Sequence, residues 1–184
     1  MQGGSAPTGR CLTATSRAPA PTCRVAGRLA AAYVRRVARI LILVGTESGN
    51  AQMVADALKP VLRAAGHSVD VTDKAATPAD LCSHDVLLVV CATHGSGDIP
   101  TNIQPLAATL ERERPDLSRH RYGVIALGDM TYQDTFCGGG KKVDKVFGLC
   151  GAQKLGDRLE VDASSQPLPD EEALSWVEDW KALV

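Results

Sequence analysis

The chain has 184 residues and a formal net charge of −1, but its charges are unevenly distributed. Residues 1–39 contain seven arginines and no acidic residue, so the rest holds 13 of the 20 basic and all 21 acidic residues, a net charge of −8. No segment approaches the roughly 20 consecutive apolar residues that cross a bilayer. The six cysteines form no C-x-x-C pair, which argues against structural zinc. We therefore expect a soluble, cytoplasmic protein without a metal.

Two segments of different composition define the expected domains. Residues 1–39 are rich in Ala, Pro, Ser, Thr, Gly and Arg, and such a composition buries too little apolar surface to offset the entropy of ordering. We expect a basic, disordered leader there. It reflects either a start site placed too far upstream, with translation beginning near Val34 or Val37, or a segment resembling an organelle transit peptide. Residues 40–184 suffice for one domain with a single core.

Apolar runs and helical periodicity alternate from residue 40 onward. Short apolar or alternating runs predict strands at residues 40–44, 68–72, 86–91, 122–127 and 155–161, the second of them at a sheet edge. Apolar residues spaced by three or four predict helices at residues 54–65, 103–114, 141–150 and 170–183, with Pro60 interrupting and kinking the first. Strands alternating with helices predict an α/β fold, a doubly wound five-stranded parallel sheet with helices on both faces.

The first of three polar loops follows the first strand. Thr46 and Ser48 offer hydroxyl donors, and Gly49 permits a tight turn. The helix that starts near Asn50 points unpaired N–H groups and the positive end of its dipole at this loop, which predicts a phosphate site. The loop lacks the G-x-x-x-x-G-K and G-x-G-x-x-G signatures, which argues against nucleoside triphosphates and dinucleotides. We expect the Glu47 side chain to face solvent, because a carboxylate would repel a phosphate.

Two further loops follow the third and fourth strands and suit a planar ring. Residues 92–100 and 128–137 bear glycines and polar side chains, and their backbone N–H and C=O groups can bond the edge of a heterocycle. Tyr132 and His94 are the flat side chains available there. Because the carboxyl ends of parallel strands meet at one edge of a sheet, the three loops predict a cradle for a flat, phosphorylated ligand.

These loops resemble those of a known family. The phosphate loop at residues 46–51, the run A-T-H-G-S-G-D-I-P-T-N at residues 92–102, and the stretch from Leu127 through Tyr132 to Leu159 are together similar to the flavodoxins. The similarity is closest to the bacterial MioC-type proteins and extends to the FMN domains of sulfite reductase and cytochrome P450 reductase. It covers the chain from about residue 40 and implies the sheet order 2-1-3-4-5, with FMN bound at the switch point between strands 1 and 3.

The resemblance implies a role for each loop. It places the FMN phosphate on the first loop and the isoalloxazine between the second loop and Tyr132, which stacks on the outer face. Many relatives carry Trp or Tyr where His94 stands, which implies weaker stacking on the inner face. The peptide at Gly95 is the family's flip point, whose carbonyl turns toward N5 of the reduced flavin. The implied cofactor-binding residues are Thr46, Glu47 (through its backbone), Ser48, Gly49, Asn50, Ala51, Thr93, His94, Gly95, Ser96, Gly97, Asp98, Gly128, Asp129, Tyr132, Asp134, Phe136 and Cys137.

The implied function is electron transfer, which needs no nucleophile or acid–base pair. Because the chain ends after the last helix, we expect a stand-alone, monomeric shuttle with an NAD(P)H-dependent flavoprotein reductase as donor and a redox enzyme as acceptor. Neither nucleic acid nor a membrane is expected as a partner. Negative charge on Asp98, Asp129 and Asp134 is expected to make the second reduction of the flavin harder, and protonation of His94 is expected to make it easier.

Two other classes of protein remain open. An FMN-dependent NAD(P)H:quinone reductase would take hydride itself, so that NADPH alone would reduce its flavin rapidly. A flavin-free signalling domain such as a receiver uses the same sheet but needs clustered acids after the first strand, where only Glu47 is found. The acidic domain in turn fits docking onto a basic face of a redox partner.

Overall fold

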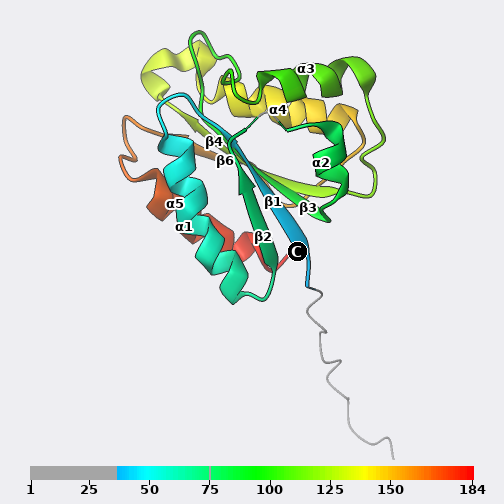
Figure 1. Ribbon diagram of the computed structural model, residues 1–184. Coiled ribbons are helices and arrows are strands. Elements are labelled where there is room, and N and C mark those ends of the chain that lie inside the picture. The colour runs from blue at the N-terminus through cyan, green and yellow to red at the C-terminus, as the bar shows by residue number, and fades with distance from the viewer. Residues whose placement is uncertain (1–36, 75) are drawn as a thin grey trace, which may run out of the picture. The chain divides into compact units, whose positions relative to one another are not determined.

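The structure, a computed structural model, describes residues 37–74 and 76–184. The expectations for residues 1–36 lie outside this part of the chain, and Arg39, the last residue of the expected leader, is the first residue of β1. In chain order the elements are β1 (Arg39–Gly45), α1 (Asn50–Ala64), β2 (Ser68–Thr72), α2 (Pro78–Cys82), β3 (Val86–Cys91), α3 (Gln104–Glu113), β4 (Arg121–Gly128), the 3-10 helix η1 (Met130–Thr135), α4 (Gly138–Leu149), β5 (Gln153–Lys154), β6 (Leu159–Asp162) and α5 (Pro169–Trp180) (Figure 1). No helix in the described ranges is long and apolar enough to cross a membrane.

A parallel sheet in the order β2-β1-β3-β4-β5 forms the centre of the fold, which confirms the order that the family resemblance implies. β1 pairs with β2 on one side and with β3 on the other, so that Ile42 lies between Val71 and Leu88. β2 pairs with β1 alone among the described strands, which confirms its edge position. The strand order reverses between β1 and β3, and open α/β sheets bind ligands at such a point.

The fifth strand differs from its predicted form, a single run over residues 155–161. It is divided into β5 and β6, which pair with the beginning and the end of β4. Between them Gly156 adopts φ +66°, and the turn brings Arg158 and Lys154 to the carboxylate of Asp144 on α4, where Lys154 Nζ lies 2.7 Å from Oδ2. A largely buried charge needs such partners, and the alternating pattern of the sequence does not reveal them.

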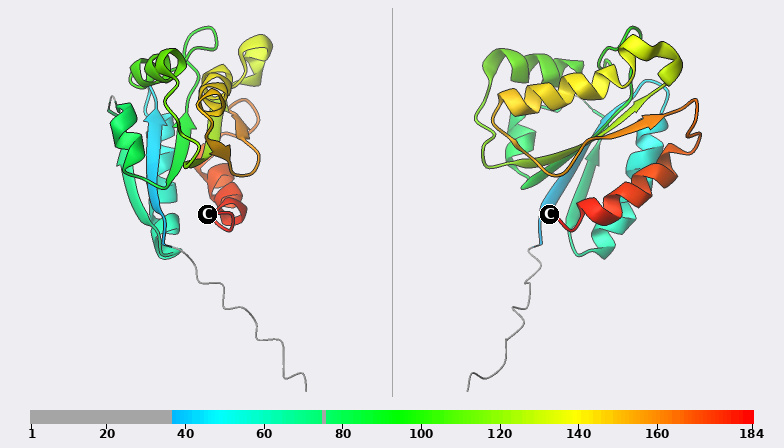
Figure 2. Two further views of the ribbon diagram at one scale, coloured as in Figure 1. Left: turned by 90° about the vertical axis from the view of Figure 1, so that its right-hand side faces the viewer. Right: turned by 180° about the vertical axis from the view of Figure 1, so that it is seen from behind.

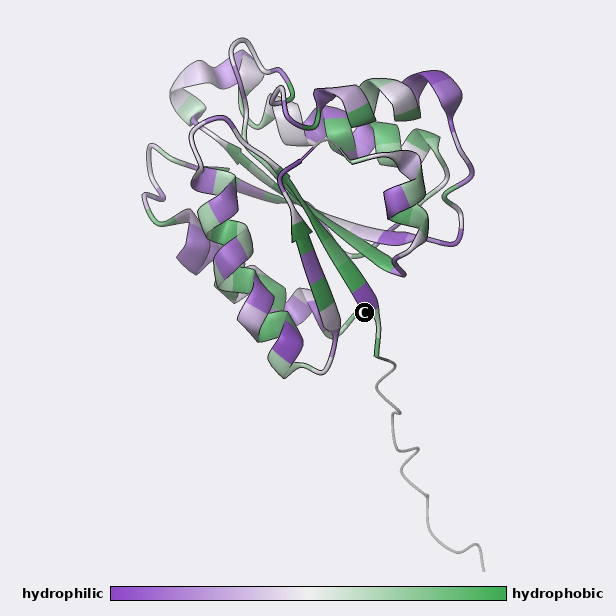
Figure 3. Ribbon diagram, in the orientation of Figure 1, coloured by the Kyte–Doolittle hydropathy of each residue, from purple (hydrophilic) through white to green (hydrophobic). Residues whose placement is uncertain are grey.

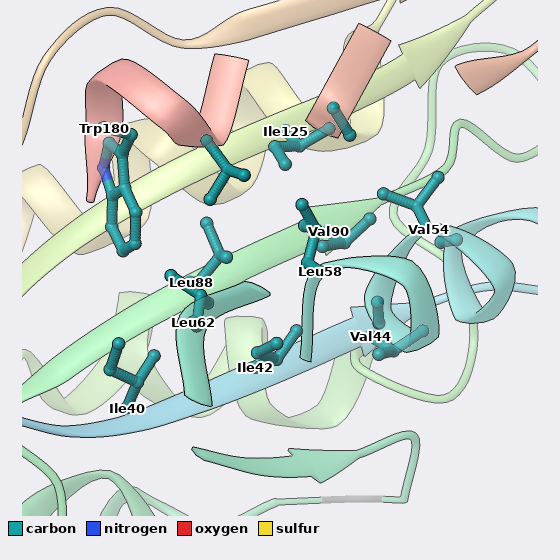
Figure 4. Packing of buried hydrophobic residues seen from close by; sticks show 14 of the residues in the cluster. Ile40, Ile42, Val44, Val54, Leu58, Leu62, Leu88, Val90, Ile125 and Trp180 are labelled. Carbon is teal, nitrogen blue, oxygen red and sulfur yellow. The ribbon is translucent and has the colours of Figure 1, made fainter. Parts of the chain in front are cut away.

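Helices cover both faces of the sheet (Figures 1 and 2). α1 and α5 cover one face, where Ile42, Leu88 and Trp180 belong to one buried cluster (Figure 4). α2, α3 and α4 cover the other face, where Leu43 on β1 and Phe147 on α4 belong to a second cluster. β1 and β3 are buried on both faces, which explains their continuous apolar runs (Figure 3).

Three helices differ from the prediction. α2 is five residues long and was not expected, although its signal is present in the capping box that Thr77 forms with Asp80. α1 continues unbroken through Pro60, so the predicted interruption is wrong. α4 begins at Gly138 rather than at residue 141. Its first turn contains three successive glycines, and such a run predicts a loop.

These glycines let α4 approach the sheet closely. A Cβ on Gly140 would lie 2.3 Å from the Cβ of Ala126 on β4, and a Cβ on Gly139 would lie 2.6 Å from the carbonyl oxygen of Ala92. In a close-packed interior neither neighbour can give way without moving a central strand or the loop that follows it. Gly148, on the exposed side of the same helix, has only the hydroxyl of Tyr122 nearby, at 3.9 Å.

We expect Gly140→Ala to lower the free energy of unfolding of the apo-protein by about 2 kcal/mol, because the added methyl group overpacks α4 against β4. Gly148→Ala is the matched control, since the same methyl group in open space leaves stability unchanged or raises it by up to about 1 kcal/mol. Urea denaturation followed by circular dichroism measures both. Equal effects of the two substitutions would contradict the close-packing explanation.

Candidate functional site

A cleft with a volume of about 510 Å³ lies at the carboxyl ends of β1, β3, β4 and β6. The structure thus brings together the three loops that the sequence singles out. Apolar residues at the strand ends and polar residues of the loops share the lining. The lining residues are Ser48, Asn50, Met53, Ala92, Thr93, Gly95, Leu127, Gly128, Asp129, Tyr132, Thr135, Val161, Ala163, Gln166, Pro167 and Pro169.

The loop after β1 ends at the N-terminus of α1. Gly49 adopts φ +91°, a left-handed conformation that favours glycine, and its N–H donates to Thr46 Oγ1 at 2.8 Å, which closes the turn. No side chain caps the first turn of α1, so its N–H groups are left for a ligand beside Ser48 and Asn50. Ala51 is fully buried in the core, so only its backbone is available.

The residues before α3 brace this loop. Asn102 Oδ1 accepts from the Thr46 N–H at 3.1 Å, and Asn102 Nδ2 donates to the Val44 carbonyl at 2.7 Å. Glu47 Oε1 accepts from the N–H and the hydroxyl of Thr101 at 2.7 Å each, and these bonds hold the pKa of the Glu47 carboxyl below its usual value. The Glu47 side chain is exposed as expected, but it is tied to Thr101. No sequence pattern reveals this bracing.

The loop after β3 is a tight turn closed by two hydrogen bonds. His94 and Asp98 form an antiparallel bridge with N···O distances of 2.9 and 2.7 Å. Inside it Gly95 and Gly97 have φ values of +50° and +87°, where a side chain would be strained. Thr93 and Gly95 line the cleft, whereas His94 is exposed and lies outside the lining. At this loop the lining therefore consists of Ala92, Thr93 and Gly95 and contains no aromatic residue, and contact between His94 and the ring stays a prediction.

The loop after β4 contributes Tyr132, the aromatic residue of the lining. Tyr132 lies in η1 and is 69% exposed, as expected for a ring that is available to stack on a ligand. The carboxylate of Asp129 caps η1 by accepting from the N–H and the hydroxyl of Thr131, at 2.8 and 2.6 Å. Gly128 must be glycine, because a Cβ there would lie 2.5 Å from the backbone nitrogen of Cys137.

Three further predicted polar residues, Ser96, Asp98 and Asp134, lie beside the cleft and outside its lining. Ser96 and Asp134 border a second hollow, which shares Tyr132 with the cleft. Asp98 forms an ion pair with Lys142 at 2.6 Å, which holds the pKa of the Asp98 carboxyl below its usual value. The ammonium of Lys142 thus lies against the carboxylate of Asp98, and an effect of Asp98, Asp129 and Asp134 on the flavin stays a prediction.

Phe136 and Cys137 lie where η1 passes into α4, also outside the lining. The Phe136 carbonyl accepts from Lys141 Nζ at 2.9 Å, and the same ammonium lies 5.2 Å from the centre of the Phe136 ring. Cys137 is fully buried, and its thiol donates to the Ala126 carbonyl. Burial raises the pKa of this thiol to about 12, so it stays neutral. A contact of either residue with a cofactor stays a prediction.

A fourth wall of the cleft is absent from the predicted set. The loop between β6 and α5 contributes Ala163, Gln166 and Pro167, α5 contributes its first residue, Pro169, and α1 contributes Met53. Sequence reasoning misses this loop because it contains no glycine and no part of the family's motifs. The position of this loop directly after the last predicted strand could have indicated that it borders the cleft, since the carboxyl ends of parallel strands share one edge of the sheet.

The cleft fits a flat, phosphorylated ligand of the FMN type. The uncapped N-terminus of α1 suits a phosphate in a lining that contains no Lys or Arg. Thr93, Gly95 and Gly128 offer backbone donors and acceptors to the edge of a ring, and Tyr132 offers a face for stacking. No group of three or more His, Cys, Asp and Glu side chains that could hold a metal occurs among the described residues.

Comparison with known proteins decides the family. The profile of the flavodoxin family matches residues 42–176. The chain belongs to the flavodoxin family. It is 42% identical over 149 residues to Flavodoxin YqcA of Pectobacterium carotovorum subsp. carotovorum, which covers 80% of this chain and 98% of that protein. It is 34% identical over 148 residues to Protein MioC of Escherichia coli K12, which covers 80% and 99%.

A solved structure and a larger reductase agree with this assignment. The structure of a point mutant of the flavodoxin from Pseudomonas aeruginosa matches with a TM-score of 0.73 and 34% identity over 79% of this chain and 97% of that chain. The sulfite reductase [NADPH] flavoprotein alpha-component of Vibrio parahaemolyticus is 31% identical over 149 residues, which cover 24% of that protein. The predicted flavodoxin resemblance is confirmed, and the chain is an FMN-binding electron-transfer protein of this family.

We expect Asn102→Ala to weaken FMN binding about tenfold, because the Thr46 N–H and the Val44 carbonyl lose their partner and the phosphate loop is no longer held. Binding of riboflavin, which lacks the phosphate, should change little. Gln104→Ala, at the exposed start of α3, is the control. Fluorescence titrations of the apo-protein measure both ligands, and an equal loss for riboflavin would contradict a role confined to the phosphate loop.

Proposed function

We propose that the protein carries single electrons from an NAD(P)H-dependent flavoprotein reductase to a redox enzyme. The observation that carries this proposal is the chemistry of the cleft lining, in which Asp129 and Tyr132 are the titratable groups. Acid–base and nucleophilic catalysis need paired groups within hydrogen-bonding reach of a substrate. The lining in the described part of the chain supplies no such pair, which favours a carrier over an enzyme that transforms a substrate.

The residues of the cleft divide the binding of FMN among them. The N–H groups of Asn50 and Ala51 in the first turn of α1 and the Ser48 hydroxyl would hold the phosphate. The backbone of Thr93 and Gly95 would bond the ring edge, and Tyr132 would cover the outer face. When bound, FMN supplies the one-electron chemistry. The apolar strand-end residues exclude water from the inner part of the ring site and leave the Tyr132 side open to a partner.

Charge and thiol chemistry support the proposed partners and compartment. Residues 40–184 carry a net charge of −8, and the first turn of α5, next to the fourth wall, contains Asp170, Glu171 and Glu172. Such a surface favours encounter with a basic face of a reductase or acceptor. Cys82 is exposed and is a free thiol, which suits the reducing cytoplasm. We further propose that the protein acts there as a monomer.

Electron delivery is tested by anaerobic stopped-flow reduction of the FMN-loaded protein. NADPH alone should reduce it slowly, and a catalytic amount of an NADPH-dependent flavoprotein reductase should accelerate reduction strongly. The acceleration should decline as salt is raised, because screening weakens attraction between the two surfaces. Rapid reduction by NADPH alone would instead indicate an FMN-dependent NAD(P)H:quinone reductase.

Asp129 and Asp98 should differ in their effect on the flavin potential. Asp129→Asn removes a charge from the cleft lining while the amide oxygen still caps η1, so the potential of the second one-electron reduction should rise by about 40 mV, roughly what a unit charge several Å away supplies. Asp98→Asn is the matched control and should raise it less, because Asp98 is exposed and lies outside the cleft lining, where solvent and salt screen its charge. Redox titration measures both shifts, and a larger shift for Asp98→Asn would rule out this assignment.

A further inference from the structure

Asp162 is the last residue of β6 and lies outside the cleft lining. It pairs with Gly128 across the sheet, and the next residue, Ala163, donates its N–H to the Gly128 carbonyl at 2.9 Å. At this point two walls of the cleft begin, η1 on one side and the loop at residues 163–168 on the other. The Asp162 side chain is thus at the junction of both walls.

The carboxylate of Asp162 accepts hydrogen bonds from both walls. Oδ1 accepts from the N–H of Met130, the first residue of η1, at 2.8 Å. Oδ1 also accepts from the Ser164 N–H at 3.0 Å, and both oxygens accept from the Ser164 hydroxyl at 2.8 and 2.7 Å. Oδ2 accepts from the Ser165 hydroxyl at 2.7 Å. The bond from Met130 and those from the serines hold the pKa of this carboxyl far below its usual value.

The backbone of Asp162 adds a second attachment to the same loop. Its N–H donates to Gln166 Oε1 at 2.9 Å, and its carbonyl accepts from the Gln166 N–H at 2.7 Å. Gln166 itself lines the cleft, as do Pro167 and Pro169 after it. The position of this wall is therefore set by bonds that converge on Asp162.

We infer that Asp162 is a positioning residue that clamps η1 to the loop at residues 163–168 and so holds Tyr132 and the fourth wall around the ring site. This inference rests on the proposed binding of FMN in the cleft. A carboxylate has two oxygens with room for all of these donors, whereas an amide replaces one acceptor by an NH₂ group that faces donors. Charge-assisted bonds are also stronger than neutral ones. Asp162→Asn should therefore loosen both walls at once.

Asp162→Asn is tested in the full-length apo-protein with Asp157→Asn as the matched control. Asp157 is exposed in the turn between β5 and β6 and contacts Trp176 through its backbone carbonyl, which the substitution keeps. Hydrogen–deuterium exchange should rise in residues 129–136 and 163–168 of Asp162→Asn and in neither segment of Asp157→Asn. The affinities for FMN and riboflavin should both fall about tenfold, because the clamp acts on the ring side.

Unchanged affinities, or faster exchange in only one of the two segments, would overturn the clamp. If Asp162→Asn does not fold, the double substitution Ser164→Ala, Ser165→Ala removes the hydroxyl donors only. It should raise exchange at residues 163–168 and weaken riboflavin binding, and no change in either would equally refute the inference. Hydrogen–deuterium exchange is measured without a ligand. Failure of the wild-type protein to bind FMN would therefore overturn the proposed function. The clamp would still be tested by the exchange rates of the two segments.

Discussion

Parallel pairing of β1 with β3 is the constraint on which the site depends. β1 leads to α1 on one face of the sheet and β3 leads to α3 on the other, so the loops after these strands part and leave space at the carboxyl edge. The pairing of Gly128 with Asp162 then brings the loops after β4 and β6 to the same edge. The apolar strands that fix this order are buried on both faces, so the cleft rests on the most stable part of the fold.

Side chains that form hydrogen bonds with backbone groups hold the loops of the cleft in place. Beyond the last ladder bond of a strand, N–H and C=O groups still need partners. Asn102 supplies them on the phosphate side and Asp162 on the ring side, and neither residue lines the cleft. A binding site whose loops are already held loses less conformational entropy when a ligand binds. The arrangement thus gives a largely preformed site with an open face for partners.

The sequence predicts the fold and the phosphate loop because both depend on local signals. Continuous apolar runs identify β1 and β3, and Gly49 before a periodic helix identifies the tight turn at the start of α1. The failures depend on contacts between residues far apart in the chain. The glycine run at the start of α4 is explained by the close approach of this helix to Ala126 on β4. The division of the fifth strand is explained by the ion pair between Arg158 and Asp144. The fourth wall likewise follows from the arrangement of the strand ends in space.

We propose that the four strand-end loops together form one FMN site. Titration of the apo-protein into FMN, followed by flavin fluorescence, tests it most directly. The structure predicts saturation at one FMN per chain with strong quenching, because the ring enters a cleft beside the aromatic face of Tyr132. Inorganic phosphate at high concentration should compete with FMN, since both anions need the N-terminus of α1. Flavin fluorescence that stays unchanged at protein concentrations well above that of FMN would contradict the account.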